Sequence, residues 1–484
     1  MTREGGATKS TKCEPTQVRS GGVALATVLP LALAIAPLAV AVWAVARYTV
    51  DLPWMDEWEL VPLVERSYEG TLSLRDLWMA HNEHRFLFPR LILLALVRLT
   101  RWNVYYEVAA NVVLACAIAA LLVWQARLTA RPFARWGASW LVPAVSVLVF
   151  SLAQWENWIW GWQVAIWLNV LVVVGGVILL TQERSFGWRL GLAVLCGIVA
   201  QYSFANGIGY WIVGLFALAV RPLGSARAKG AAIAVWVVAA AAATGSYLYG
   251  YQVPAYQSPV ALFLQQPAEF ARYILIYLGR PLGAPHAAMM GLLGLLCLGA
   301  VGAGVVRLRV LPARELTPYL CLSLYAILSA AITGVGRLGF GALQALTPRY
   351  VTIANLLWVS NAALLYFLGA GLLGRRGEGA HPGYRWAAAG SAWLALLIML
   401  LASIQSSAQG LPAMAATSAR LAAARAEVQS AKDPELLRVL YPDLDLLRKR
   451  IKVLQQLDLS LFRESPSGRG EDAGGAGRGE TGRD

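Results

Sequence analysis

Long apolar runs recur along this chain and alternate with short polar connectors. Most of these runs approach or exceed the roughly 20 apolar residues that a helix needs to cross the hydrocarbon core of a bilayer. Hydrophobic residues make up 58% of the chain and charged residues 14%, with a mean hydropathy of +0.56. These values lie outside the range of soluble globular domains. The sequence therefore predicts an all-α, polytopic transmembrane protein.

The apolar runs give eleven candidate spans within a membrane domain at residues 22–405. The first run is too long for the core of a signal peptide, which takes about 7–15 residues, so we expect a retained span. Residues 86–100 are short for a span and contain Pro89, Arg90 and Arg98, which favours an interfacial helix. The candidate spans are 22–48, 104–124, 138–154, 162–181, 189–204, 207–221, 230–250, 286–306, 317–335, 350–371 and 386–405.

Basic residues are distributed unevenly between alternate connectors. The N-terminal segment 1–21 and the connectors on its side carry 18 basic residues, whereas connectors 155–161 and 205–206 on the other side carry none. By the positive-inside rule the N-terminus lies in the cytoplasm, and the odd number of spans places the C-terminus outside the cytoplasmic membrane. The outer loop 49–103 is rich in basic residues, although the rule predicts few of them in an outer loop. This suggests that these charges have a function on the outer side of the membrane.

Two classes of function are disfavoured by the same distribution of residues. The net charge of +14 comes from basic residues scattered between apolar runs, so we expect no nucleic-acid partner. There is no Walker A sequence, which argues against an ATP-driven pump.

The sequence after the last candidate span divides into two parts. Residues 406–463 are expected to form a small extracytoplasmic helical tail that folds back on the membrane domain or its outer loops. Its last helix would place four apolar residues on one face, namely Leu444, Leu447, Ile451 and Leu454. Residues 464–484 are rich in Gly, Arg and acidic residues and are predicted to be disordered.

An acidic motif follows the first span, with the sequence Trp-Met-Asp-Glu-Trp at residues 54–58. Asp56 and Glu57 should therefore lie near the outer membrane face. A partly desolvated carboxylate there could act as a general base or hold a divalent metal such as Mg²⁺ or Mn²⁺. The alternative is a solvated loop acid flanked by tryptophans of the interfacial aromatic belt.

A second polar cluster contains His81, Glu83, His84 and Arg85. On a helix the two histidines would share a face, with the arginine beside them, so the group could bind a metal or hold a substrate phosphate. A metal site would need a third ligand, for which Asp56 is a candidate. The remaining alternative is a structural hydrogen-bond cluster that anchors the loop.

Further candidate substrate contacts lie at the outer ends of later spans. Arginines there could bind a lipid-linked phosphate, or they could extend toward lipid headgroups. A turn rich in tryptophan and amide at 154–163 could hold a sugar ring, or it could belong to the aromatic belt. The residues concerned are Glu156, Asn157, Arg280, Arg337, Arg349 and Tyr350.

With these motifs in place, the chain resembles the GT-C superfamily of polytopic glycosyltransferases. Asp56-Glu57 stands at the position of that superfamily's acidic motif, and residues 347–350 resemble the Arg-Tyr element that opens a late span in bacterial members. The motifs at 55–58, 81–85 and 154–158 resemble still more closely a group of bacterial membrane proteins within or near the superfamily.

The resemblance implies a GT-C-like fold and transfer of a sugar from a polyprenyl-phosphate donor to an acceptor on the outer face of the membrane. Asp56 would deprotonate the acceptor hydroxyl, and arginines would hold the donor phosphate. The chain lacks a large soluble C-terminal domain and a WWDYG-like motif, so a glycan or lipid of the cell envelope is a better acceptor than a protein.

Two other functions compete with the transferase. The chain could be a transporter or flippase of a lipid-linked envelope intermediate, or a non-catalytic assembly protein with the same fold. Transporters usually place polar residues at the middle of the membrane. Here the acids, histidines and selected arginines are expected at the outer face, which favours the transferase.

Overall fold

The computed structural model describes residues 20–131, 139–182, 187–221, 225–253, 259–374, 382–430 and 433–463. Within these ranges all regular secondary structure is helical, apart from an isolated β-bridge between His81 and His84. The all-α prediction is therefore confirmed. Residues 1–19 of the N-terminal segment predicted at 1–21 lie outside the described residues, as does the predicted disordered tail 464–484.

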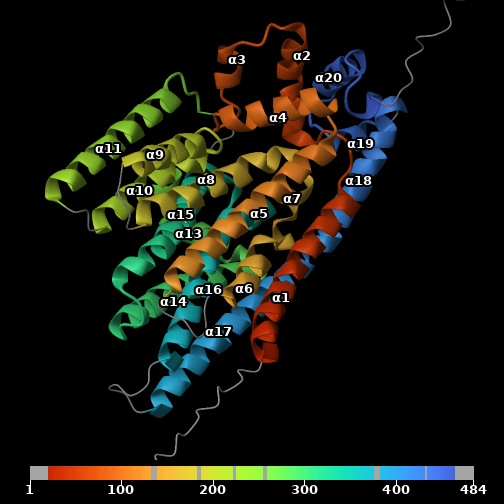
Figure 1. Cartoon of the computed structure of the whole chain (residues 1–484). Coiled ribbons are helices and arrows are strands. Elements are labelled where there is room, and N and C mark those ends of the chain that lie inside the picture. Colours follow the sequence, from red (N-terminus) through yellow and green to blue (C-terminus); the bar gives the residue numbers. More distant parts are fainter. Residues whose placement is uncertain are drawn as a thin grey trace, which may run out of the picture.

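Eight helices among the described residues are long and apolar enough to cross a membrane (Figure 1). Helices of this length and composition indicate a membrane-embedded protein. The helices that supply these spans are α1 (Ser20–Tyr48), α5 (Val104–Thr129), α8 (Val164–Thr181), α11 (Ala226–Leu248), α14 (Ala287–Arg307), α15 (Ala313–Arg337), α16 (Val351–Gly374) and α17 (Pro382–Ala408).

The remaining candidate spans form shorter helices, so the total of eleven stays a prediction. The run at 189–204 lies in α9 (Gly187–Gln201), and the run at 207–221 lies in α10 (Gly209–Val220). The run at 138–154 contains only α6 (Leu141–Val149), whose nine residues are too few to cross a bilayer alone, followed by the short η2 (Leu152–Gln154).

One helix, buried over its C-terminal half, was not predicted. The sequence assigns 251–285 to an outer connector, yet α13 (Pro267–Gly279) lies there, with Tyr273 and Tyr277 fully buried. A Cβ at Gly279 would collide with the backbone of the neighbouring helix α14, so this glycine allows the two helices to approach closely. At 13 residues, α13 is too short to register as a span in a search for long apolar runs.

The helix ends fall into two groups, one beside the connectors that are poor in basic residues and one beside the connectors that are rich in them. The start of α8, the residues before α10 and α16, and the ends of α11 and α15 all line one cavity. The opposite ends of these helices lead into the connectors that are rich in basic residues. The cavity therefore occupies the end of the bundle that the sequence assigns to the outer face.

The 49–103 loop lies at the same end of the molecule (Figure 1). It contains η1 (Met55–Leu60), α2 (Val61–Glu69), α3 (Leu74–Trp78) and α4 (Leu87–Thr100), so the helix expected at 86–100 is present. Short elements from the bundle complete this end, namely α7 (Trp155–Ile159), η3 (Gly161–Gln163), η4 (Ala205–Ile208), α12 (Leu262–Gln265), η5 (Arg280–Leu282), η6 (Leu338–Phe340), η7 (Ala342–Leu346) and η8 (Pro348–Tyr350).

The C-terminal residues return to this loop. α17 continues past the predicted span end at 405 and is followed, after one residue, by α18 (Gly410–Ser430), which carries the chain beyond the bundle (Figure 1). α19 (Pro434–Arg438), α20 (Leu444–Gln456) and η9 (Ser460–Phe462) follow, with α20 packed against α2 and the Ser460 N–H of η9 donating to the Arg101 carbonyl. The apolar face predicted for this last helix is the face that is buried or partly buried.

Candidate functional site

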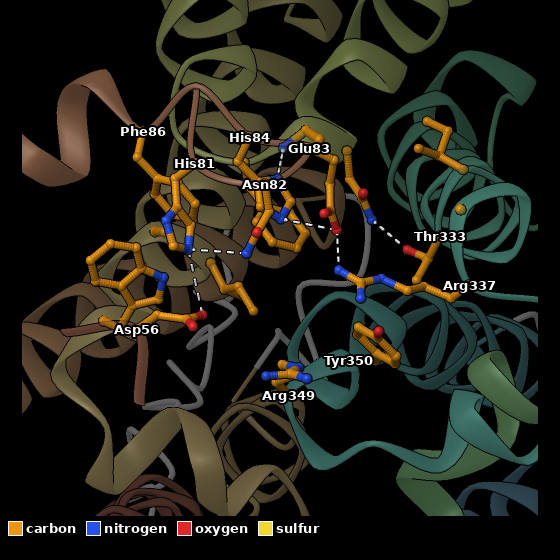
Figure 2. A pocket seen from close by; sticks show the side chains of 18 of the residues that line it. Asp56, His81, Asn82, Glu83, His84, Phe86, Thr333, Arg337, Arg349 and Tyr350 are labelled. Atoms are coloured by element: carbon orange, nitrogen blue, oxygen red, sulfur yellow. Dashed lines mark hydrogen bonds and ion pairs between the residues drawn. The ribbon is translucent and has the colours of Figure 1, made fainter. Parts of the chain in front are cut away.

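The cavity at the loop end of the bundle has a volume of about 600 Å³ (Figure 2). Its walls come from η1, the 81–86 segment, η3, η4, and the helix ends described above. Seven of the residues that the sequence singles out line it together, namely Asp56, His81, Glu83, His84, Arg337, Arg349 and Tyr350. These residues span nearly 300 positions of sequence, so the fold alone brings them together.

Asp56 and His81 form an acid–histidine pair on one wall of the cavity (Figure 2). The Asp56 Oδ2 atom lies 3.7 Å from His81 Nε2. Burial alone would raise the pKa of Asp56, but contact with His81 and the positive charge of Arg349 outweigh burial and lower this pKa below its ordinary value. Asp56 is therefore an ionised carboxylate that faces the cavity.

Residues 81–84 form a tight turn, which corrects the helix expected there. The His81 N–H donates to the His84 carbonyl at 2.7 Å, and the His84 N–H donates back at 2.9 Å. Asn82 has a φ of 52°, a left-handed conformation that asparagine tolerates better than most residues. Because cross-strand partners project to the same side, both histidines reach the cavity while Arg85 does not.

His84 is held as a neutral ring by its neighbours. Its Nδ1 atom accepts the Ala205 N–H at 3.0 Å, and its ring stacks on Phe204 with centroids 4.6 Å apart. Burial lowers the pKa of His84 to about 4. The Nε2 atom lies 3.5 Å from Glu83 Oε1, and Glu83 also pairs with Arg337, which links the turn to the end of α15 (Figure 2).

Arg349 is the basic group that stands most openly at the cavity. Its side chain is 36% exposed and lies near the Trp160 ring, with Cζ 5.9 Å from the ring centroid. The nearest paired acid is Glu156, whose Oε2 atom lies 3.9 Å from Arg349 Nε. At that distance the guanidinium keeps hydrogen-bonding capacity for an anionic ligand.

Two residues predicted to touch substrate instead support the segment around Arg349. Glu156 supplies the ion pair, and Asn157 donates to the Arg349 carbonyl at 2.9 Å and to Thr352 Oγ1 at 2.6 Å. Neither lines the cavity. Tyr350 does line it, with its hydroxyl accepting a hydrogen bond from Gln344 Nε2 at 2.9 Å.

Two predicted arginines lie outside the cavity lining and bind backbone carbonyls. Arg85 is buried and donates to the carbonyls of Trp78, Tyr247 and Tyr249. Arg280 donates to the Leu346 carbonyl at 2.9 Å and to Ser406 Oγ at 3.3 Å. A guanidinium has five N–H donors in a planar fork, which suits it to hold several loop carbonyls at once. In this structure both arginines fix loops around the cavity.

Glu57, predicted to be catalytic beside Asp56, is buried behind the cavity wall. Its Oε2 atom accepts the Trp54 N–H at 2.7 Å, and its Oε1 atom accepts the Trp162 N–H at 3.0 Å. The carboxyl of Glu107 from α5 lies against it, since a Cβ at Gly161 would collide with both acids. Glu57 therefore ties η1 to η3, and Glu107 is a partner that no motif in the sequence indicated.

Two buried carboxyls in contact cannot both be ionised without a large penalty, so the pair shares at least one proton near neutral pH. Burial raises the pKa of Glu57 to about 7. An acid whose pKa is higher in the folded protein than in the unfolded chain stabilises the fold at low pH. That stabilisation is lost as the pH rises through the pKa of the folded protein. We expect the pair to lower the stability of the fold between pH 5 and pH 8 by on the order of 1–3 kcal/mol, whereas neutral His84 contributes in the opposite direction below about pH 6.5. The measurement is therefore the difference in melting temperature between the wild type and Glu107→Gln over this pH range.

The two acids should respond differently to substitution. Glu107→Gln keeps a donor for the Glu57 carboxylate and should flatten the pH dependence, whereas Glu57→Gln places an amide N–H against a backbone N–H and should destabilise at every pH. Glu435→Gln, at an exposed site on α19, is the matched control. An unchanged pH slope in Glu107→Gln would contradict the shared proton.

The possible metal site is not assembled. Asp56, His81 and His84 do not form a ligand group, and the described residues hold no cluster of three or more His, Cys, Asp or Glu side chains placed for a metal ion. His84 already uses Nδ1 as an acceptor for a backbone N–H. The Asp56–His81 pair alone provides fewer ligands than a protein metal site normally has.

Comparison of the chain with family models, with curated proteins and with solved structures gives no match. The observations that bear on function are therefore the membrane-length helices and the chemistry of the cavity.

Proposed function

We propose that the protein is a membrane glycosyltransferase that moves a sugar from a polyprenyl-phosphate donor to a glycan or lipid acceptor on the outer face of the cytoplasmic membrane. The observation that carries this proposal is the meeting of Asp56 with Arg337 and Arg349 at one cavity (Figure 2). A sugar phosphate donor needs cations at its phosphate, and an acceptor hydroxyl needs a base. The cavity supplies both.

The proposed reaction uses Asp56 as the general base. The acceptor hydroxyl gives its proton to the Asp56 carboxylate while its oxygen bonds to the anomeric carbon of the donor sugar. The bond between that carbon and the phosphate oxygen breaks, and polyprenyl phosphate leaves with the bonding electron pair. Arg349 stabilises the charge that develops on the phosphate, and Asp56 afterwards releases its proton to water.

The rest of the cavity suits a lipid-linked sugar. Leu248 and Phe340 line it and are 54% and 56% exposed, so an apolar rim joins the polar interior to the outside of the bundle. Trp160 and Trp162 also line it, and aromatic faces beside polar groups suit a sugar ring. The volume of about 600 Å³ is within the range of small-molecule sites.

The position of the charged groups is the reason to prefer a transferase to a transporter. Asp56, Glu83, Arg337 and Arg349 gather at one end of the helices. A flippase of the same lipid-linked sugar would need polar contacts along its path through the membrane. A non-catalytic assembly protein would not need an ionised acid and an available guanidinium at one cavity.

The direct test is mass spectrometry of envelope glycans and glycolipids from cells with and without the gene. We expect one envelope product to lose a sugar in the deletion strain and to regain it on complementation, while the lipid-linked donor accumulates. Loss of the sugar with the lipid-linked donor trapped on the cytoplasmic side would favour the flippase, whereas accumulation of the donor on the outer side supports the transferase. An unchanged set of glycans would contradict the transferase.

A further inference from the structure

The C-terminal residues 439–463, which we call the C-terminal clasp, form hydrogen bonds with residues on both sides of Asp56. Before Asp56, the Met55 N–H donates to the Leu440 carbonyl at 2.8 Å, and Trp54 Nε1 donates to the Val439 carbonyl at 3.2 Å. These bonds join positions almost 400 residues apart in sequence. The clasp therefore contacts the residue immediately before the proposed base.

The backbone at Met55 needs such a restraint. The φ angle of Met55 is 51°, in the left-handed region that residues other than glycine and asparagine rarely adopt. A conformation of this kind persists only when surrounding contacts fix it. The hydrogen bond to Leu440 is one of those contacts. The direction in which the Asp56 side chain points depends on this backbone conformation.

After Asp56, a partly buried ion pair fixes the other side of η1. Arg450 on α20 donates to both carboxylate oxygens of Glu59, with distances of 3.1 and 2.8 Å. The Tyr441 hydroxyl donates to the same carboxylate, and the Arg450 guanidinium lies over the Tyr441 ring at 4.9 Å. Burial alone would raise the pKa of Glu59, but these partners outweigh it and lower the pKa, so Glu59 is ionised.

The end of the clasp makes two more ties to the same region. Arg463 pairs with Asp51, whose other oxygen accepts the Val104 N–H at the start of α5 at 3.0 Å. Arg101 donates to the Asp458 carbonyl at 2.9 Å. The clasp is therefore fixed to both ends of the 49–103 loop, which gives it a rigid base from which to hold η1.

We propose that the C-terminal clasp is a positioning element of the catalytic site, and that Arg450 acts through Glu59 to orient Asp56. This inference rests on the proposed transferase. Neither Arg450 nor Glu59 lines the cavity, so neither touches substrate. Loss of their ion pair should loosen η1 and lower turnover while leaving the phosphate-binding arginines, which belong to α15 and η8, in place.

The test uses the full-length protein in lipid nanodiscs, with Glu59→Arg, Arg450→Glu and the double exchange. Each single reversal should speed hydrogen exchange of the amides of residues 54–60 by about 10-fold or more. It should also lower kcat by about 10–100-fold, as expected when a catalytic group is misplaced by about 1 Å. The affinity for a polyprenyl-phosphate sugar should change less than about twofold. The double exchange should restore both exchange protection and kcat.

A control and a milder variant keep the result interpretable. Arg448→Glu reverses an exposed charge on the same helix and should change neither measurement. Arg450→Lys keeps the charge but not the paired hydrogen bonds, so it should give a smaller effect if the reversals fail to fold. Unchanged exchange at 54–60 in the single variants, or loss of donor affinity in step with kcat, would overturn the positioning role. Absence of transfer by the wild-type protein would overturn the proposed function instead, and the exchange measurement would still show whether the clasp holds η1.

Discussion

Replacement of Asp56 by asparagine should lower sugar transfer by about 10²–10⁴-fold while donor binding persists. Asparagine keeps the size and the hydrogen-bonding geometry of the side chain but cannot accept the proton of the acceptor hydroxyl. Because Asp56 is held ionised by His81 and Arg349, the wild-type activity should fall only at acidic pH, as this carboxylate becomes protonated. The measurement is transfer by purified protein with donor affinity determined in parallel.

Asp445→Asn, whose side chain is 88% exposed on α20, is the matched control and should keep full activity. The assay should be run with chelator and with added Mg²⁺ or Mn²⁺, because Asp56 could also be a metal ligand. Loss of activity on chelation would favour the ligand role, and indifference would favour the base. Full transfer by Asp56→Asn under both conditions would exclude Asp56 from the chemistry and make Glu83 the acid to test next.

The expected metal-independent role follows from the surroundings of Asp56 rather than from its motif. His81 is the nearest partner, and the other histidine of the turn is occupied by a backbone N–H. Asp56 thus has one imidazole neighbour and an open side toward the cavity. This arrangement leaves a carboxylate oxygen available to the acceptor hydroxyl.

The sequence predicted the helical membrane domain well because the signal is local. A run of about 20 apolar residues can be recognised without knowing what packs against it. The prediction weakened where helices are short, as in α6 and α13, because burial inside the bundle then compensates for length. Such helices depend on close contacts, of which Gly279 against α14 is an example, and those contacts are not visible in a hydropathy pattern.

The sequence also selected every acid, histidine and arginine that lines the cavity, since these residues stand out in an apolar chain. It could not assign their roles. Glu57 and Arg85 lie next to cavity residues in the sequence, yet Glu57 is buried on backbone N–H groups and Arg85 on carbonyls. In irregular segments, adjacent side chains point in different directions, and only the three-dimensional turn decides which reach the cavity.

The largest gap concerned partners distant in sequence. Arg450 lies 391 residues from Glu59, in a helix whose pattern predicted only an apolar face. Glu107 lies one turn into a membrane-length helix, where a single acid gives no motif. Both contacts are set by tertiary packing, so no spacing rule could have indicated them.

Arg349→Ala should weaken binding of a polyprenyl-phosphate donor by about 10–100-fold, which corresponds to the roughly 1.5–3 kcal/mol of a hydrogen bond to a charged group. Arg349→Lys should have a donor affinity between those of the wild type and Arg349→Ala, because a lysine keeps the charge but cannot bind phosphate with two parallel N–H groups. Arg272→Ala, an exposed arginine of α13 outside the cavity lining, is the control and should bind like the wild type.

Arg337→Ala should also weaken donor binding, but its effect is less direct. Arg337 pairs with Glu83, so its removal leaves a negative charge at the cavity as well as taking a positive one away. The double variant Arg337→Ala with Glu83→Gln should therefore regain part of the lost donor affinity, whereas no second substitution at Glu83 should rescue Arg349→Ala. If Arg349→Ala binds the donor with wild-type affinity, Arg349 is not part of a phosphate site and interacts with lipid headgroups instead. The ion pair with Glu156 and the contact with the Trp160 ring would then explain the position of Arg349.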